Sequence, residues 1–148
     1  MKGIRRVGTP EAGLHYLFHD PCHTPMKQFA GIEVARKLIG TPVMLTDRCC
    51  GEAGTLAIAR PDISTQVRFR KQEEFEKNIA ARDDDAPHTR VFTACPSCLQ
   101  GLMRYCSPSN GLDTDYLVVE LARNVLGDGW MEEYVEKANN GGIERVLL

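Results

Sequence analysis

The chain contains three short apolar runs that predict buried β-strands. They cover residues 14–18, 42–46 and 90–94. Apolar runs of this length are typical of strands when turn-forming residues bound them, whereas helices need longer stretches. We therefore expect three strands, with polar or helical segments between them.

Apolar residues at helical spacing predict four longer helices. These cover residues 26–39, 63–82, 114–126 and 130–138. A shorter helix is expected to follow Cys98 and to end at Tyr105, before a turn-rich loop over 107–113. In the helix over 63–82, the expected buried side carries Ile63, Val67, Phe75 and Ile79. Strands that alternate with helices predict an α/β fold, with a small parallel sheet flanked by helices.

The length fits a single domain. A chain of 148 residues buries about 70% of its unfolded surface on folding, so it can form a hydrophobic core without disulfides. The composition, 43% hydrophobic and 26% charged, is ordinary for a globular protein. We expect one domain with a core over about 14–106 and a helical extension over 114–148.

Charge and hydropathy argue against several classes of partner. The net charge is −2 and the isoelectric point is about 6.1, which argues against binding to nucleic acid or to an anionic membrane surface. No stretch approaches the ~20 apolar residues that a membrane-spanning helix needs. Residues 1–10 carry positive charges with no apolar run behind them, so we expect no signal peptide. The predicted compartment is the cytoplasm, where thiols stay reduced.

Five of the six cysteines follow the predicted strands. One follows the first strand, an adjacent pair follows the second, and a C-x-x-C motif follows the third; these are Cys22, Cys49, Cys50, Cys95 and Cys98. Parallel strands end at the same edge of a sheet, and open α/β sheets bind ligands at that edge. We therefore expect the five thiols to converge there. Cys106 lies beyond the motifs, and we expect it to pack in the core.

Five convergent thiols favour a polynuclear metal centre. Thiolates are soft ligands that select iron–sulfur clusters, zinc and copper(I). Four of them complete a tetrahedral zinc site or a cubane cluster, so a fifth is surplus to either. The adjacent Cys49 and Cys50 place two sulfurs within reach of neighbouring metals. Zinc bound by the same cysteines is the second interpretation. A thioredoxin-like dithiol at Cys95 and Cys98 is the third, since it leaves the other cysteines unexplained.

Histidines and glycines flank the cysteines. His19 and His23 lie on either side of Cys22, close enough to join the site. A histidine beside a metal ligand more often hydrogen-bonds to sulfur or backbone than ligates the metal, and we expect that role for both. Gly51 and Gly54 leave room for the backbone to approach a cluster and to donate N–H groups to its sulfurs.

Three motifs together carry a family resemblance. They are HDPCH at 19–23, CCGEAG at 49–54 and CPSC at 95–98. This series is similar to the CCG domain found in heterodisulfide reductase and in the iron–sulfur subunits of glycolate and lactate oxidases. The resemblance implies a 4Fe-4S cluster, which is non-cubane in heterodisulfide reductase, and electron transfer among flavin, thiol or quinone partners. It also implies the cluster ligands: Cys22, Cys49, Cys50, Cys95 and Cys98.

The tail also carries a resemblance. Residues 115–148 look like the carboxyl end of large bacterial FAD-linked oxidases, which fuse a CCG domain to a flavin domain. This implies FAD on a partner domain or subunit, and an electron-transfer domain rather than a complete enzyme. Any attachment to the inner membrane would then be made through partners. The chain departs from the family in two ways. It has one CCG repeat where many members have two, and its first gap between motifs is short and its second long. The alternative function is a structural or assembly module that holds zinc with the same cysteines.

Overall fold

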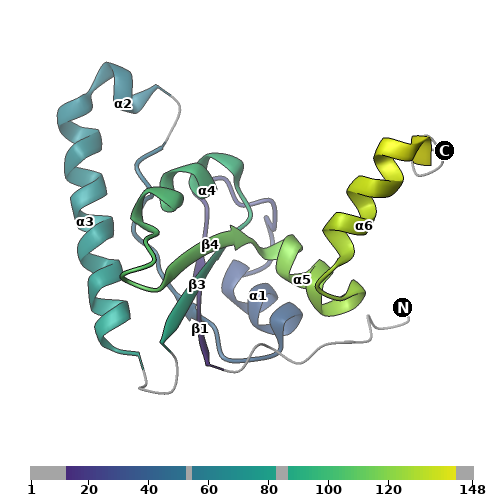
Figure 1. Cartoon of the computed structure of the whole chain (residues 1–148). Helices are drawn as coiled ribbons and strands as arrows, with labels where there is room; N and C mark the ends of the chain where they lie inside the picture. Colours follow the sequence, from purple (N-terminus) through teal and green to yellow (C-terminus); the bar gives the residue numbers. More distant parts are fainter. Residues whose placement is uncertain (1–12, 53–54, 83–86, 143–148) are drawn as a thin grey trace.

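The computed structural model describes residues 13–52, 55–82 and 87–142, and its centre is a parallel β-sheet (Figure 1). The strands are β1 (Leu14–His19), β2 (Met44–Leu45), β3 (His88–Thr93) and β4 (Leu112–Tyr116). They are ordered β2-β1-β3-β4, and every neighbouring pair is parallel. The predicted α/β class, a small parallel sheet flanked by helices, is confirmed.

Strands β1 and β3 form the buried centre of the sheet. Their inner residues are fully inaccessible to solvent: Leu17, Phe18, Val91 and Phe92. Strands covered on both faces need such continuous apolar runs, which is why residues 14–18 and 90–94 stand out in the sequence. Since successive side chains point to opposite faces, the two phenylalanines enter one core cluster and Leu17 and Val91 enter the other.

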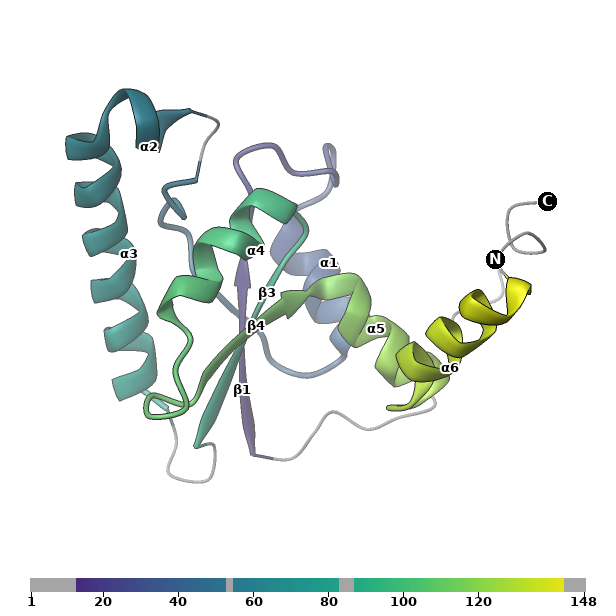
Figure 2. The ribbon, with the colours of Figure 1, turned by 45° about the horizontal axis from the view of Figure 1, so that its top comes forward.

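Two pairs of helices cover the two faces of the sheet (Figure 1). Helices α1 (Gly31–Ile39) and α5 (Leu117–Leu126) contribute to one core cluster, and α3 (Pro61–Ala80) and α4 (Pro96–Leu102) contribute to the other. Figure 2 shows α6 extending away from the sheet beyond α5. The remaining elements are α2 (Leu56–Ala59), a 3-10 turn (Met103–Tyr105), α6 (Trp130–Lys137) and an irregular turn (Ala138–Gly142). Within the described part of the chain, no helix has both the length and the apolar character needed to cross a membrane.

Three predicted boundaries are wrong. The helix expected over 114–126 begins at Leu117, because residues 112–116 form β4 on the outer side of β3. The first helix begins at Gly31 rather than at residue 26, because Lys27 has a left-handed backbone (φ +46°) that a helix does not accommodate. The strand expected over 42–46 is reduced to Met44–Leu45 at the sheet edge.

The buried side of α3 also differs from the prediction. Phe75 is buried as predicted, whereas Ile63 is exposed. The other buried positions are Ser64 and Lys71. A lysine on the buried side is contrary to the apolar pattern, and its polar partners are Glu74 on the same helix and Thr46 after β2.

We expect Phe92→Ala to lower the free energy of unfolding by about 3–5 kcal/mol, because it empties a fully buried ring site. The Phe92 ring stacks on Tyr16 with centroids 5.4 Å apart. Phe29→Ala is the matched control, since Phe29 is 70% exposed and its loss should cost about 0.5 kcal/mol or less. Denaturant unfolding of both variants measures the difference, and equal losses would contradict the assigned core.

Candidate metal centre

The turns after β1, β2 and β3 bring five cysteines to one edge of the sheet. Strands β1 and β3 run side by side in register, and His19 at the end of β1 pairs with Thr93 at the end of β3. Cys22 and Cys95 follow these ends, and Figure 2 shows α4 and the turn after β1 at the same end of the sheet. The strand order reverses between β1 and β3, since β2 lies on one side of β1 and β3 on the other. Open α/β sheets bind ligands at such a switch point.

A cavity of about 200 Å³ lies at this edge. Its lining includes all five cysteines of the three motifs. The lining residues are Pro21, Cys22, His23, Cys49, Cys50, Glu52, Cys95, Ser97 and Cys98. Thiols from three motifs, which are separated in the sequence by 26 and 44 intervening residues, therefore share one small space. All six cysteines of the chain are free thiols.

The inner part of the site is formed by two thiols and a histidine. The Cys50 and Cys98 sulfurs are 3.4 Å apart. A ring nitrogen of His19 and these two sulfurs all lie within 4.8 Å of one another. The three residues are buried, whereas Cys22 is exposed and Cys49 and Cys95 are intermediate. The site thus has an enclosed side at Cys50 and Cys98 and an open side at Cys22.

His19 lies in the interior beside two of the thiols. It is 1% exposed, and neither ring nitrogen makes a hydrogen bond to any described residue. Buried polar atoms are rarely left unsatisfied in native proteins. The sulfurs of Cys50 and Cys98 lie within 4.8 Å of one of its ring nitrogens.

The backbone at Gly51 explains why a glycine follows the cysteine pair. Its φ is +78°, in the left-handed region that favours glycine. A Cβ there would lie 3.1 Å from Arg68 Cγ. The Gly51 N–H donates to the Cys49 sulfur at 3.4 Å, so the turn gives this thiol a backbone donor. Gly54, the other glycine predicted to serve the site, lies outside the described residues.

The thiols differ in acidity. The pKa of Cys50 is lowered from 9.0 to about 5, mainly because the Cys98 thiol donates a hydrogen bond to it; burial opposes this effect, and the nearby His19 imidazole lowers the pKa further. The same contact raises the pKa of Cys98 well above its usual range. Burial raises the pKa of Cys49. One ionised thiol therefore forms first, on the enclosed side of the site.

Charged residues that the sequence analysis missed support the turn with the cysteine pair. Glu52 accepts a hydrogen bond from Arg68 at 3.1 Å and forms an ion pair with Arg104. Gly101 makes room for the Glu52 side chain, because a Cβ there would overlap Glu52 Cγ. Lys71, with no exposed surface, contacts the turn before Cys49. Its helical spacing from Ser64 and Phe75 on α3 could have indicated that this lysine is buried.

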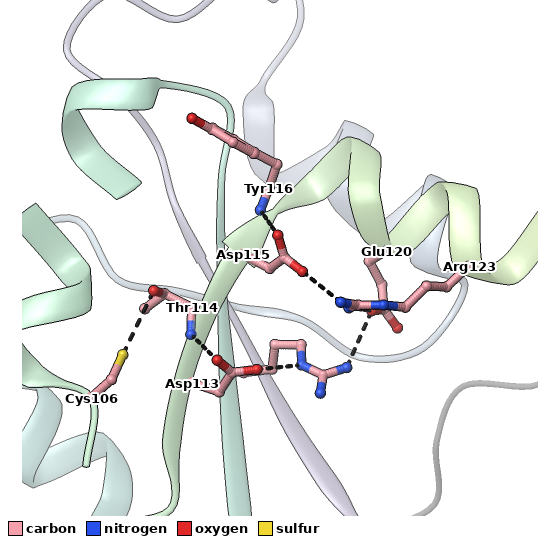
Figure 3. A network of polar contacts seen from close by, with 8 residues as sticks. Cys106, Asp113, Thr114, Asp115, Tyr116, Glu120 and Arg123 are labelled. Atoms are coloured by element: carbon pink, nitrogen blue, oxygen red, sulfur yellow. Dashed lines mark hydrogen bonds and ion pairs between the residues drawn. The ribbon is translucent and has the colours of Figure 1, made fainter. Parts of the chain in front are cut away.

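Cys106 lies apart from the cavity, as expected from its position beyond the motifs. Its sulfur is 3.6 Å from Thr114 Oγ1 on β4 (Figure 3). Burial raises its pKa. Figure 3 also shows the polar contacts that join β4 to α5, including the ion pair of Arg123 with Asp115 at 2.9 Å. Cys106 thus provides a control cysteine outside the site.

Known families match both parts of the chain. The family model for the cysteine-rich domain (CCG) matches residues 16–103. The family model for a domain of unknown function (DUF3400) matches residues 103–148. The glycolate oxidase iron-sulfur subunit of Escherichia coli (strain K12) is 38% identical over 64 residues. That alignment covers 40% of this chain and 16% of the relative, so the chain spans only a small part of the relative's length. No solved structure matches the chain.

We expect Cys50 to be a thiolate at neutral pH in the metal-free protein. The folded pKa of Cys50, about 5, lies below the ordinary value of 9.0. Ionisation of Cys50 therefore stabilises the fold. This contribution is complete at a pH above 9.0 and is lost as the pH falls through about 5. Cys50→Ser should therefore remove thiolate ultraviolet absorbance at neutral pH under anaerobic conditions. Cys106→Ser, which removes a thiol of raised pKa, should leave the absorbance unchanged. Equal losses in the two variants would contradict the assignment.

Proposed function

The chain belongs to the cysteine-rich (CCG) domain family, and on that premise we propose that it binds an iron–sulfur cluster and acts in redox chemistry. The observation that carries the proposal is the cavity of about 200 Å³ lined by all five motif cysteines. The proposed cluster ligands are Cys22, Cys49, Cys50, Cys95 and Cys98. Such a cluster, when bound, accepts and donates electrons one at a time.

The donor set in the cavity is suited to such a cluster. Sulfur supplies all five proposed ligands, and soft thiolates are the ligands that iron–sulfur clusters select. The ionised Cys50 already favours metal binding, because the thiolate and not the thiol is the ligand. His19 lies beside Cys50 and Cys98, and its imidazole makes no hydrogen bond within the described part of the chain. We propose that His19, His23 and the Gly51 N–H contact sulfur rather than iron, and we extend the same role to Gly54.

The relative supports a redox role with a partner protein. That relative is the iron-sulfur subunit of a glycolate oxidase. We propose a cluster of the 4Fe-4S type in this chain, with electrons passing to or from FAD on a partner domain or subunit. In this proposal the chain is one cluster-binding domain, with a core over about 14–106 and an extension over 114–148, that works in the cytoplasm. The proposal limits the chain to electron transfer, since a cluster alone does not provide the hydride chemistry of a flavin.

Zinc is the second candidate, and one observation favours it. His19, Cys50 and Cys98 place their ligand atoms within 4.8 Å of one another, which is compact enough for a single tetrahedral ion. The site would then be structural, and the domain would serve in assembly. Metal content separates the two candidates, because zinc sites contain no sulfide.

We expect anaerobically purified protein to contain iron and acid-labile sulfide in similar amounts. Cys50→Ser should lose both, because it removes the most acidic thiol from the centre of the site. Cys106→Ser should retain both, since that sulfur lies outside the cavity. Metal and sulfide analysis of the three proteins, before and after reconstitution, provides the measurement. One zinc per chain and no sulfide in every preparation would overturn the cluster and support the zinc module.

We expect the purified chain to turn over neither glycolate nor lactate without a flavin protein. The physical reason is that removal of a hydride from a 2-hydroxy acid needs an organic acceptor, which the five thiols do not supply. Artificial-acceptor assays with cluster-loaded protein measure this. Turnover of either acid by the chain alone would contradict the role of electron carrier.

A further inference from the structure

A fully buried lysine contacts the turn that carries two of the cysteines. Lys71 lies on α3 and has no exposed surface. Its Nζ donates to Thr46 Oγ1 at 2.6 Å and to the Thr46 carbonyl oxygen at 3.3 Å. Thr46 comes directly after β2 and shortly before Cys49. The lysine therefore holds the end of the strand from which the cysteine pair begins.

Glu74, one turn further along α3, completes this attachment. Its Oε2 pairs with Lys71 Nζ at 2.8 Å. Its Oε1 accepts a hydrogen bond from the Asp47 N–H at 3.1 Å. Two side chains of one helix thus bind two consecutive residues of the turn, and the Lys71 ammonium also lies 4.8 Å from the centre of the Phe75 ring.

Packing alone does not explain why a fully buried position holds a lysine. A buried ammonium is unfavourable unless it is paired, and well-packed apolar residues often replace buried ion pairs without loss of stability. Burial lowers the pKa of Lys71, and Glu74, Asp47 and Cys50 act in the opposite direction. The ammonium lies at Thr46, three residues before Cys49, so its charge is close to the turn that carries the cysteine pair.

We propose that Lys71 is a positioning residue of the metal centre, which fixes the Cys49–Cys50 turn through Thr46 and places its buried positive charge beside that turn. The inference rests on the proposed function in one respect, namely that these thiols bind metal. It does not depend on whether the metal is iron or zinc. Its two parts, attachment and charge, lead to different results in variants of Lys71 and Glu74.

The test is anaerobic titration of the reduced, metal-free chain with Co²⁺ alone. Lys71→Met removes the charge and the donors but retains an unbranched stem, and we expect it to weaken Co²⁺ binding at least ~10-fold. Lys77→Met is the matched control, because Lys77 lies on the same helix and is exposed. Its Kd should equal that of the wild type.

Glu74→Gln tests the pairing of the ammonium. It removes the counter-charge of the buried Lys71 and leaves one acceptor oxygen in place of two, so Co²⁺ binding should weaken, by less than in Lys71→Met. Thermal melting of the metal-free variants is the second readout: a purely structural role would make weaker binding follow lower stability, whereas a positioning role makes the loss of binding exceed the loss of stability. Thr46→Val removes the hydroxyl that accepts the 2.6 Å hydrogen bond from Lys71, and it should weaken Co²⁺ binding in a chain that retains Lys71. This variant tests the attachment if Lys71→Met does not fold.

Each outcome decides between the inference and the proposed function. A Kd within about twofold of the wild type for Lys71→Met and Thr46→Val would overturn the role of Lys71, even in a chain that holds iron and sulfide. Absence of iron and sulfide with a Lys71-dependent Co²⁺ affinity would overturn the cluster and retain the inference. A wild-type chain that binds no Co²⁺ would overturn the inference, and its iron and sulfide content would still decide the cluster.

Discussion

Parallel pairing of β1 with β3 is the constraint on which the site depends. The two strands are in register from Leu14 with His88 to His19 with Thr93, so their carboxyl ends stop at the same level. Their inner side chains are fully buried on both faces, which fixes this register, because a shift by one residue would turn every side chain to the opposite face. Cys22 and Cys95 follow these two ends, so the aligned strands bring them to the same edge of the sheet.

Polar contacts support the part of the site that the sheet does not fix. Strand β2 has only two residues, so backbone pairing alone gives the cysteine pair little support. The missing support comes from α3 and from the segment after α4. Lys71 and Glu74 bind residues 46 and 47 on one side of Cys49–Cys50, and Arg68 and Arg104 bind Glu52 on the other. Charged groups paired in this way orient a turn that few apolar contacts hold.

The solvent exposure of the cysteines differs from one side of the cavity to the other. Cys50 and Cys98 are almost inaccessible to solvent and share a hydrogen bond, whereas Cys22 and His23 are exposed. Electrostatic effects are stronger where water is excluded, so the pKa values of Cys50 and Cys98 on the enclosed side depend strongly on their neighbours. The open side gives the same cavity access to solvent. A metal centre in this cavity would thus combine a fixed inner part with an accessible rim.

The sequence by itself determined the α/β class, the two central strands and the place of each cysteine motif after a strand, because continuous apolar runs and motif order are local signals. It missed β4, whose alternating Asp113 and Asp115 resemble a loop until β3 pairs beside them. It also missed Lys71, and it could not show that His19 lies against Cys50 and Cys98. Only the tertiary structure decided these points, since a polar residue can be buried only where distant parts of the chain supply its partners.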